Sequence, residues 1–175
     1  MRENRYKHLE TRNKVLIGLM IYQGLTSDEL TRLTIANIDL DKGTVYIKGS
    51  KNLAQRELEL KSPQTLMLYK YINEDRPHLL KSTTDKLLVG TRGVGISTDA
   101  IHSMVEQLKS LFPDTRLSPQ TIRQSVICNW LNKDKIAIEH VQQMAGHKYP
   151  SSTMKYQKKD ADEQRKLINK FHPLN

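Results

Sequence analysis

Two short runs of alternating apolar and polar residues, DKGTVYIKG and AQRELEL, lie close together in the sequence. Such alternation is typical of strands, and the SKNL that joins them is rich in residues that turns prefer. The pair therefore predicts a β-hairpin. The run KLLVGT, residues 86–91, predicts a third strand. The sheet that this chain can build is thus small, and the other elements must surround it.

The remaining regular segments have the periodicity of helices. Apolar residues from Leu9 to Tyr22 recur at close to 3.6 residues and stop at Gly24. Thr26 or Ser27 can cap a short helix that follows. Further helices are expected over 62–77, 99–111, 119–132, 136–146 and 160–171, with a short turn after 150. The expected fold is mixed but mainly α, a multihelical domain around a small three-stranded antiparallel sheet.

Length and composition bound the class of protein. The chain has 175 residues, which fits one domain over 1–175. The single cysteine, Cys128, excludes an internal disulfide framework and a four-cysteine metal site. No apolar run approaches the roughly 18 residues of a membrane-spanning helix, and the charged MRENRYKHLETRNK is unlike a signal peptide. We therefore expect a cytoplasmic protein with no membrane segment.

The charge indicates the class of partner. Lys and Arg number 28 against 19 Asp and Glu, a net charge of +9. Such an excess attracts polyanions, so nucleic acid is the leading candidate partner. A merely basic, solvated surface is the alternative, and only particular residues can decide between the two.

Basic residues occur at the tip of the predicted hairpin. Lys48 and Lys51 flank Gly49, which permits a tight turn and a close approach of the backbone to a ligand. A flexible lysine there can pair with phosphate or protonate a leaving oxygen. Loop tips are also lysine-rich for solubility.

Arg123 lies one turn into the helix that starts at the Ser-Pro of LSPQTIRQSVICNWL. Gln120 precedes it by three residues and therefore shares its face. Arg123 also falls four residues before Ile127 and seven before Trp130, which places it toward the buried side. A partly buried arginine needs an anion, either a carboxylate of the protein or a phosphate of a ligand. Both remain open from the residues alone.

The stretch MAGHKYPSSTMKYQ adds two further candidates. Gly146 is expected to end a helix, so that His147 projects from the turn behind it. Tyr156 follows on the next short helical segment. Either residue alone would be unremarkable in a structural role, but the combination with Arg123 favours a shared site.

These segments resemble the catalytic domain of the tyrosine recombinases, the phage integrase family, over nearly the whole chain. In the family pattern an arginine lies three residues after a histidine, a Gly-His follows on a later helix, and the nucleophilic tyrosine comes nine residues after that histidine. The resemblance matches Arg123 to the second family arginine, His147 to the second histidine and Tyr156 to the nucleophile. Lys48 is the better match for the hairpin lysine, with Lys51 as the alternative.

Two positions depart from the family pattern. GLTSDEL has Thr26 where the family usually has its first arginine, although Glu29 and Leu30 still match. Gln120 stands where the family has its first histidine, a milder change because glutamine can still donate a hydrogen bond. Three arginines could supply the missing cation: Arg32, Arg92 and Arg116.

The resemblance implies cleavage and rejoining of double-stranded DNA through a covalent 3′-phosphotyrosyl intermediate, without a metal or other cofactor. Arg123, Gln120 and His147 would hold the phosphate while Tyr156 attacks it, and Lys48 would protonate the departing 5′ oxygen. Contacts to the DNA backbone are expected from Lys51, Arg56 and Lys148. The protein would therefore be associated with DNA in the cytoplasm.

The resemblance also bears on domain organisation. Residues 160–175 resemble the C-terminal helix that family members pass to a neighbouring protomer, which implies self-association on DNA; packing on its own domain is the alternative. The N-terminal helical domain that family members usually carry is expected to be absent from this sequence.

Two other functions stay open. Thr26 favours a weakened family member that binds DNA or assembles with active protomers. A metal-dependent nuclease or unrelated basic binding module would need clustered ligands, and the close acidic pairs are Asp39 with Asp41 and Asp160 with Asp162. Asp41 adjoins a turn, where aspartate is common for local reasons.

Overall fold

The computed structural model describes residues 2–114 and 116–157. The predicted helix over 160–171, the tail 160–175 and the pair Asp160 with Asp162 lie outside these residues. Within them, the expected fold class is confirmed: helices surround a small three-stranded antiparallel sheet.

The chain opens with α1 (Arg2–Gln23), which ends at Gly24 in the left-handed conformation with φ of 61°. Thr26 then caps α2 (Ser27–Arg32). The Thr26 hydroxyl accepts the Glu29 N–H at 3.2 Å, and the Glu29 carboxylate accepts the Thr26 N–H at 2.9 Å. This reciprocal capping box fixes where α2 begins and turns Glu29 inward.

The sheet has the order β1-β2-β3 and consists of β1 (Ile38–Asp39), β2 (Thr44–Ile47) and β3 (Arg56–Glu59). Both pairings are antiparallel, so the predicted hairpin is confirmed. Its register places Val45 opposite Leu58, and both side chains are buried.

The third strand predicted over Lys86–Thr91 is wrong, because β1 takes that place in the sheet. The Lys86–Thr91 segment is an irregular connection, buried from residue 87 to residue 90, that makes single β-bridges and hydrogen bonds to several different segments. Leu87 N donates to Leu33 O at 2.9 Å, and Val89 N donates to the Tyr71 hydroxyl at 3.1 Å. Because residues 87–90 are buried, they are as apolar as those of a buried strand, and the sequence pattern therefore predicted a strand.

The other helices follow the predicted order. A π-helical segment, Tyr71–Asp75, connects the helix before it to the helix after it, so that residues 62–79 are continuously helical. The 3-10 segments are Ile35–Asn37 and Leu108–Leu111. The α-helices are α3 (Ser62–Lys70), α4 (Arg76–Leu79), α5 (Thr98–Gln107), α6 (Pro119–Asn132), α7 (Ile138–Ala145) and α8 (Ser151–Met154).

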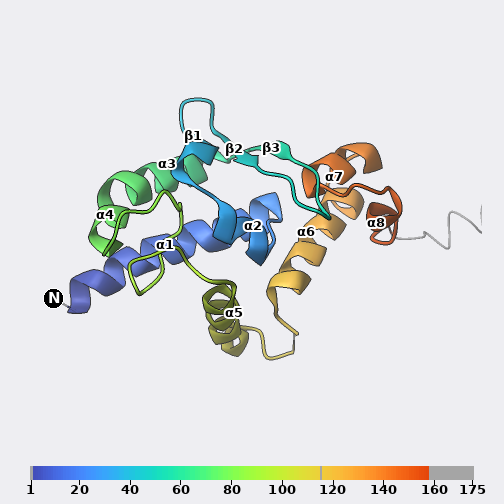
Figure 1. Cartoon of the computed structure of the whole chain (residues 1–175). Helices are drawn as coiled ribbons and strands as arrows, with labels where there is room; N and C mark the ends of the chain where they lie inside the picture. The colour runs from blue at the N-terminus through green and yellow to red at the C-terminus, as the bar shows by residue number, and fades with distance from the viewer. Residues whose placement is uncertain (1, 115, 158–175) are drawn as a thin grey trace, which may run out of the picture.

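Two hydrophobic clusters hold these elements together. The larger one joins α1 to the sheet, α3 and α5, and the smaller one joins α6 to α7. Figure 1 shows α1 running beneath the sheet, with α6, α7 and α8 gathered at the opposite end of the molecule from its N-terminus. None of the helices within residues 2–114 and 116–157 is both long and apolar enough to cross a membrane.

Candidate active site

A pocket of about 430 Å³ lies where α2, α5 and α6 approach one another beside Tyr156. Its lining includes Thr26 at the N-cap of α2, Asp28 of α2, His102 of α5, Gln120 and Arg123 of α6, and Tyr156. Residues separated by 130 positions in the sequence, from Thr26 to Tyr156, thus face one cavity. The pocket brings three of the predicted catalytic side chains together: Gln120, Arg123 and Tyr156.

Arg123 is fixed by backbone carbonyls. Its guanidinium donates from Nη1 to Gly24 O and from Nη2 to Ala145 O, the latter at 2.5 Å. Burial lowers the pKa of Arg123, and the nearby Glu29 carboxylate opposes that shift. Nη1 lies 3.9 Å from Glu29 Oε2, beyond hydrogen-bond distance. The guanidinium is therefore held at the pocket by two backbone carbonyls, and the nearest carboxylate, Glu29, is shared with Arg56.

Arg56 lies inside the protein and does not line the pocket. Its guanidinium donates to Glu29 Oε1 at 2.6 Å and to Met144 O at 2.7 Å, and its side chain is only 5% exposed. Its position therefore gives no support to a contact with the DNA backbone. Arg56 instead joins α2 to the end of α7.

His147 follows Gly146, which caps α7 in the left-handed conformation as predicted. The His147 Nδ1 lies 2.8 Å from the Thr153 hydroxyl, and Thr153 is fully buried. Burial lowers the pKa of His147 to about 4, helped by the positive charges of Arg123 and Lys155. The ring is therefore neutral near pH 7, and its Nε2 is the nitrogen left for a ligand.

Tyr156 lies just after α8 and is half-buried against the smaller hydrophobic cluster. Its ring stacks near that of His147, with centroids 6.2 Å apart and planes 16° apart. Its backbone carbonyl accepts a hydrogen bond from Asn132 Nδ2 at 3.1 Å, from the last turn of α6. The same helix thus carries Arg123 near one end and holds the backbone of Tyr156 at the other.

The hairpin loop that carries Lys48 and Lys51 is tied down beside His147. The Ala54 N–H donates to Gly146 O at 2.8 Å, and Lys148 Nζ donates to Ser50 O at 3.0 Å and to Lys51 O at 2.9 Å. Lys48 and Lys51 are exposed. Neither lysine lines the 430 Å³ pocket, although their loop is bonded to the turn that carries His147.

Of the three arginines considered for the missing cation, Arg32 lies nearest the hairpin. Its Nη1 donates to Gly49 O at 3.3 Å and its Nη2 pairs with Asp28 Oδ2 at 2.9 Å. Arg92 and Arg116 are exposed and do not line the pocket. Neither His102 nor Asn132 belongs to a motif with a recognisable spacing, so neither was predicted as a site residue.

The acidic pair Asp39 with Asp41 serves the turn between β1 and β2. Asp39 Oδ1 accepts the Lys42 N–H at 2.9 Å, and this bond lowers the pKa of the Asp39 carboxyl. The pair is thus occupied locally, away from the pocket that holds Tyr156.

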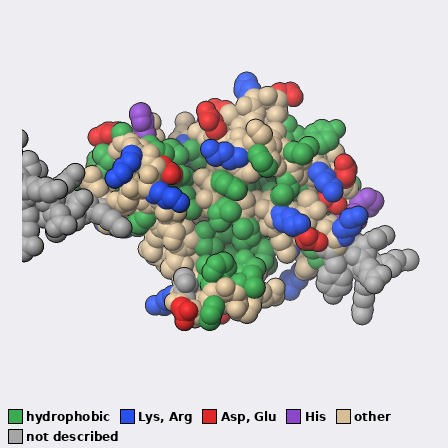
Figure 2. Space-filling view, turned by 180° about the vertical axis from the view of Figure 1, so that it is seen from behind, with side chains coloured by type: hydrophobic (Ala, Val, Ile, Leu, Met, Phe, Trp, Pro, Cys, Tyr) green, Lys and Arg blue, Asp and Glu red, His purple; other side chains and the backbone are tan. Residues whose placement is uncertain are grey.

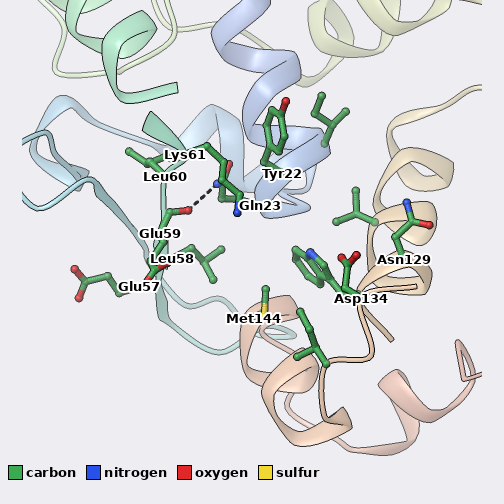
Figure 3. Close-up of a pocket in the computed structure, with 14 residues that line it drawn as sticks. Tyr22, Gln23, Glu57, Leu58, Glu59, Leu60, Lys61, Asn129, Asp134 and Met144 are labelled. Atoms are coloured by element: carbon green, nitrogen blue, oxygen red, sulfur yellow. Dashed lines mark hydrogen bonds between the residues drawn. The ribbon is translucent and has the colours of Figure 1, made fainter. Parts of the chain in front are cut away.

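A second pocket, of about 720 Å³, lies between the end of α1, β3 and the α6–α7 connection. Figure 3 shows Glu57, Glu59 and Asp134 at its border, and Gln23 donating to the Glu59 carbonyl at 2.8 Å. None of the predicted catalytic residues lines it.

On the face seen in Figure 2, Lys and Arg side chains are scattered around a hydrophobic middle, with Asp and Glu among them.

The lowered pKa of His147 makes a prediction about stability. A group whose pKa is lower folded than unfolded binds more protons when unfolded, so its contribution is lost as the pH falls from about 6.5 toward 4. We expect the free energy of unfolding of His147→Gln to fall less between pH 7 and pH 5 than that of the unmodified protein. Urea titrations at both pH values measure this, and His140→Gln, at an exposed histidine, is the control. Equal pH dependence in all three proteins would contradict the prediction.

Comparison with known families gives a match over residues 1–163 to the phage integrase family. Among curated proteins, the chain is 32% identical over 165 residues to the tyrosine recombinase XerD of Staphylococcus aureus, covering 93% of this chain and 55% of that protein. The XerD of Staphylococcus saprophyticus is 30% identical over 164 residues with the same coverage. The chain therefore spans about half the length of these relatives.

Solved structures share the fold. The XerH site-specific recombinase bound to difH substrate has a TM-score of 0.77 at 20% identity, covering 97% of this chain and 51% of that one. The XerA recombinase has a TM-score of 0.75 at 20% identity, covering 100% and 65%. With a family match that extends over most of its length and a fold that agrees, the chain belongs to the phage integrase family of tyrosine recombinases.

Proposed function

We propose that this chain is the DNA strand-transferase part of a site-specific recombinase and that Tyr156 is its nucleophile. The observation that carries the proposal is the convergence of Tyr156, Arg123 and Gln120 on one pocket, with the His147 ring beside Tyr156. The phenolic oxygen attacks a phosphodiester and loses its proton to solvent. The bond from phosphorus to the 5′ oxygen breaks, which leaves the 3′ phosphate joined to the tyrosine.

Charge develops on the non-bridging oxygens during this attack, and donors aimed at them lower the barrier. Arg123 supplies a cation that is already held in place, and Gln120 is exposed at the pocket one turn away on α6. When the Thr153 hydroxyl donates to His147 Nδ1, the neutral ring carries its proton on Nε2 and becomes a third donor. The site therefore needs no metal ion to hold the phosphate.

The hairpin supplies the proton for the leaving group in this proposal. Lys48 is exposed at the end of β2, with Lys51 as the alternative from the same loop. Arg32 and Lys148 fix the backbone of that loop from two sides, through Gly49 and through Ser50 and Lys51. Because the loop is anchored beside His147, a lysine on it can approach the departing 5′ oxygen and protonate it.

Double-stranded DNA is the proposed substrate. The net charge of +9 and the exposed Lys51 and Lys148 at the border of the site support it. The Tn1549 transposon integrase structure with the same fold contains a circular intermediate DNA, and the XerH structure contains its difH substrate. We also propose, on the resemblance alone, that residues 160–175 contribute to self-association on DNA.

Incubation with a nicked duplex whose cleavage product diffuses away tests the proposal. The chain should form an adduct with DNA that survives denaturation, and mass spectrometry of its peptides should locate the DNA on Tyr156. Thr26 favours the second candidate, a weakened member that binds DNA without cleaving it. DNA binding without an adduct on any such duplex would support that candidate and refute the first. An adduct on another residue would refute the role of Tyr156.

The hydrogen bond from Asn132 to the Tyr156 carbonyl predicts a role in positioning the nucleophile. One neutral hydrogen bond contributes about 1 kcal/mol, which corresponds to a roughly fivefold change in rate. We expect Asn132→Ala to slow adduct formation by about that factor and to leave DNA affinity unchanged. Single-turnover cleavage and equilibrium binding separate the two effects. Asn129→Ala, at an exposed position one turn earlier on α6, is the matched control. Equal rates for both variants would exclude the positioning role.

A further inference from the structure

Thr26 occupies the place of the first family arginine, and its side chain has no reach toward a phosphate. The Thr26 hydroxyl is 3.0 Å from Glu29 Oε2 and accepts the Glu29 N–H at 3.2 Å. Both contacts belong to the cap of α2. A hydrogen-bond donor to a phosphate near Thr26 would therefore have to come from another element.

The arginines do not fill this gap. Arg32 has its guanidinium on Asp28 and Gly49, where it neutralises a carboxylate that itself lines the pocket. Arg92 and Arg116 are outside the lining. Arg56 is buried against Glu29. No arginine other than Arg123 lines this cavity among the residues that the structure describes.

A histidine does reach the pocket, from α5. Helix α5 packs against α2, and its residues Thr98 and His102 both line the cavity. They are four residues apart and hence on one face of the helix. Ser97 caps α5 by accepting the Ala100 N–H at 3.2 Å, which fixes the start of the helix and the face that it turns to the pocket.

The ring of His102 is exposed and uncommitted. Within residues 2–114 and 116–157, no hydrogen bond, ion pair or ring contact to His102 is present. His147, by contrast, bonds to Thr153, and His8 both pairs with Asp75 and stacks on His78. His102 is thus a free N–H donor that faces the same cavity as Tyr156 and Arg123.

We propose that His102 donates its ring N–H to a non-bridging oxygen of the phosphate that Tyr156 attacks, in the place left by Thr26. This inference rests on the proposed function of the pocket. An imidazole is shorter than an arginine side chain, but His102 projects from α5 rather than from α2 and already lines the cavity. The phosphate is then held from two sides, by Arg123 and Gln120 of α6 and by His102 of α5.

Cleavage rates give the first test. Removing one donor to a developing oxyanion typically costs about 10² to 10³ in rate, and an exposed imidazole should account for the lower part of that range. We expect His102→Ala to form the Tyr156 adduct about 100-fold more slowly than the unmodified chain. His102→Arg, which restores a cationic donor, should cleave at least as fast as the unmodified chain. His140→Ala, at an exposed histidine outside the pocket, is the matched control. Equal rates for His102→Ala and His140→Ala would overturn the proposal.

Ligand binding gives a second test that does not require cleavage. The chain labelled with ¹⁵N-histidine is titrated with orthovanadate, which mimics a phosphate under attack. The ring resonances of His102 and His147 should shift over the same vanadate concentrations, and those of His140 should stay fixed. A fixed His102 signal refutes the proposal, whether or not His147 responds. If no DNA adduct forms but His102 still responds to vanadate, the proposed reaction fails and the anion site stands.

Discussion

Replacing Tyr156 with phenylalanine is expected to abolish the covalent protein–DNA adduct, a fall of at least about 10³-fold, because the attacking oxygen is removed. DNA affinity should change little. The ring keeps its packing against the smaller hydrophobic cluster and its place beside His147, since both contacts involve the ring rather than the hydroxyl. Denaturing electrophoresis of labelled nicked duplex measures the adduct, and fluorescence anisotropy measures binding.

Tyr149→Phe is the matched control for this substitution. Tyr149 lies seven residues earlier and is 71% exposed, outside the pocket. It should cleave as the unmodified chain does. If Tyr156→Phe retained the adduct while Tyr149→Phe lost it, the nucleophile would have been misassigned. Cleavage that depends on added metal and survives Tyr156→Phe would favour a nuclease.

The substitution Glu29→Gln should cost about 3–5 kcal/mol of folding free energy, because it leaves the Arg56 charge buried and uncompensated. The Glu29 side chain is fully buried and that of Arg56 is 5% exposed. One carboxylate oxygen accepts from Arg56 and the other from the Thr26 N–H. A glutamine amide turns a donor toward one of those two donors, so one bond is lost in either orientation. Urea unfolding at pH 7 measures the loss.

The control for Glu29→Gln is Glu59→Gln, on an exposed side chain of β3. It should change stability by less than about 0.5 kcal/mol. A similar small effect at Glu29 would mean that the buried pair contributes nothing. Burial raises the pKa of Glu29, but Arg56 and Thr26 outweigh it, so the folded pKa is below the ordinary value. The pair's contribution is therefore complete above the unfolded pKa of about 4.3 and lost as the pH falls through the lower folded value.

Local patterns in the sequence predicted the elements that carry the site. Ser118 caps α6 and Pro119 begins it, as the Ser-Pro signal indicated. Thr26, one of the two expected caps, is the N-cap of α2. These signals act within a few residues of the chain, so no knowledge of tertiary contacts was needed. The spacing of Arg123 against the core stripe of α6 likewise predicted that its side chain would be partly buried.

Interactions between distant segments were not accessible in this way. The Lys86–Thr91 run has the composition of a strand, yet whether it pairs depends on Tyr71 and Leu33, which lie far from it in the sequence. The alternation along β3 puts Arg56 on the same face as the buried Leu58, but its charge can be buried there because of Glu29, 27 residues away. His102 and Asn132 acquire their places from the packing of α5 and α6, which no local spacing encodes.

Gly146 has a consequence for how such a chain can vary. It adopts φ of 70°, and a Cβ built on it would lie 2.6 Å from Arg56 Nη1 and 3.1 Å from Ala54 O. Any other residue would have to push the guanidinium away from its carboxylate partner. The glycine before His147 therefore ends a helix and also leaves the space that the Arg56–Glu29 ion pair occupies under the turn. We expect position 146 to accept a larger residue in evolution only when positions 29 and 56 change as well.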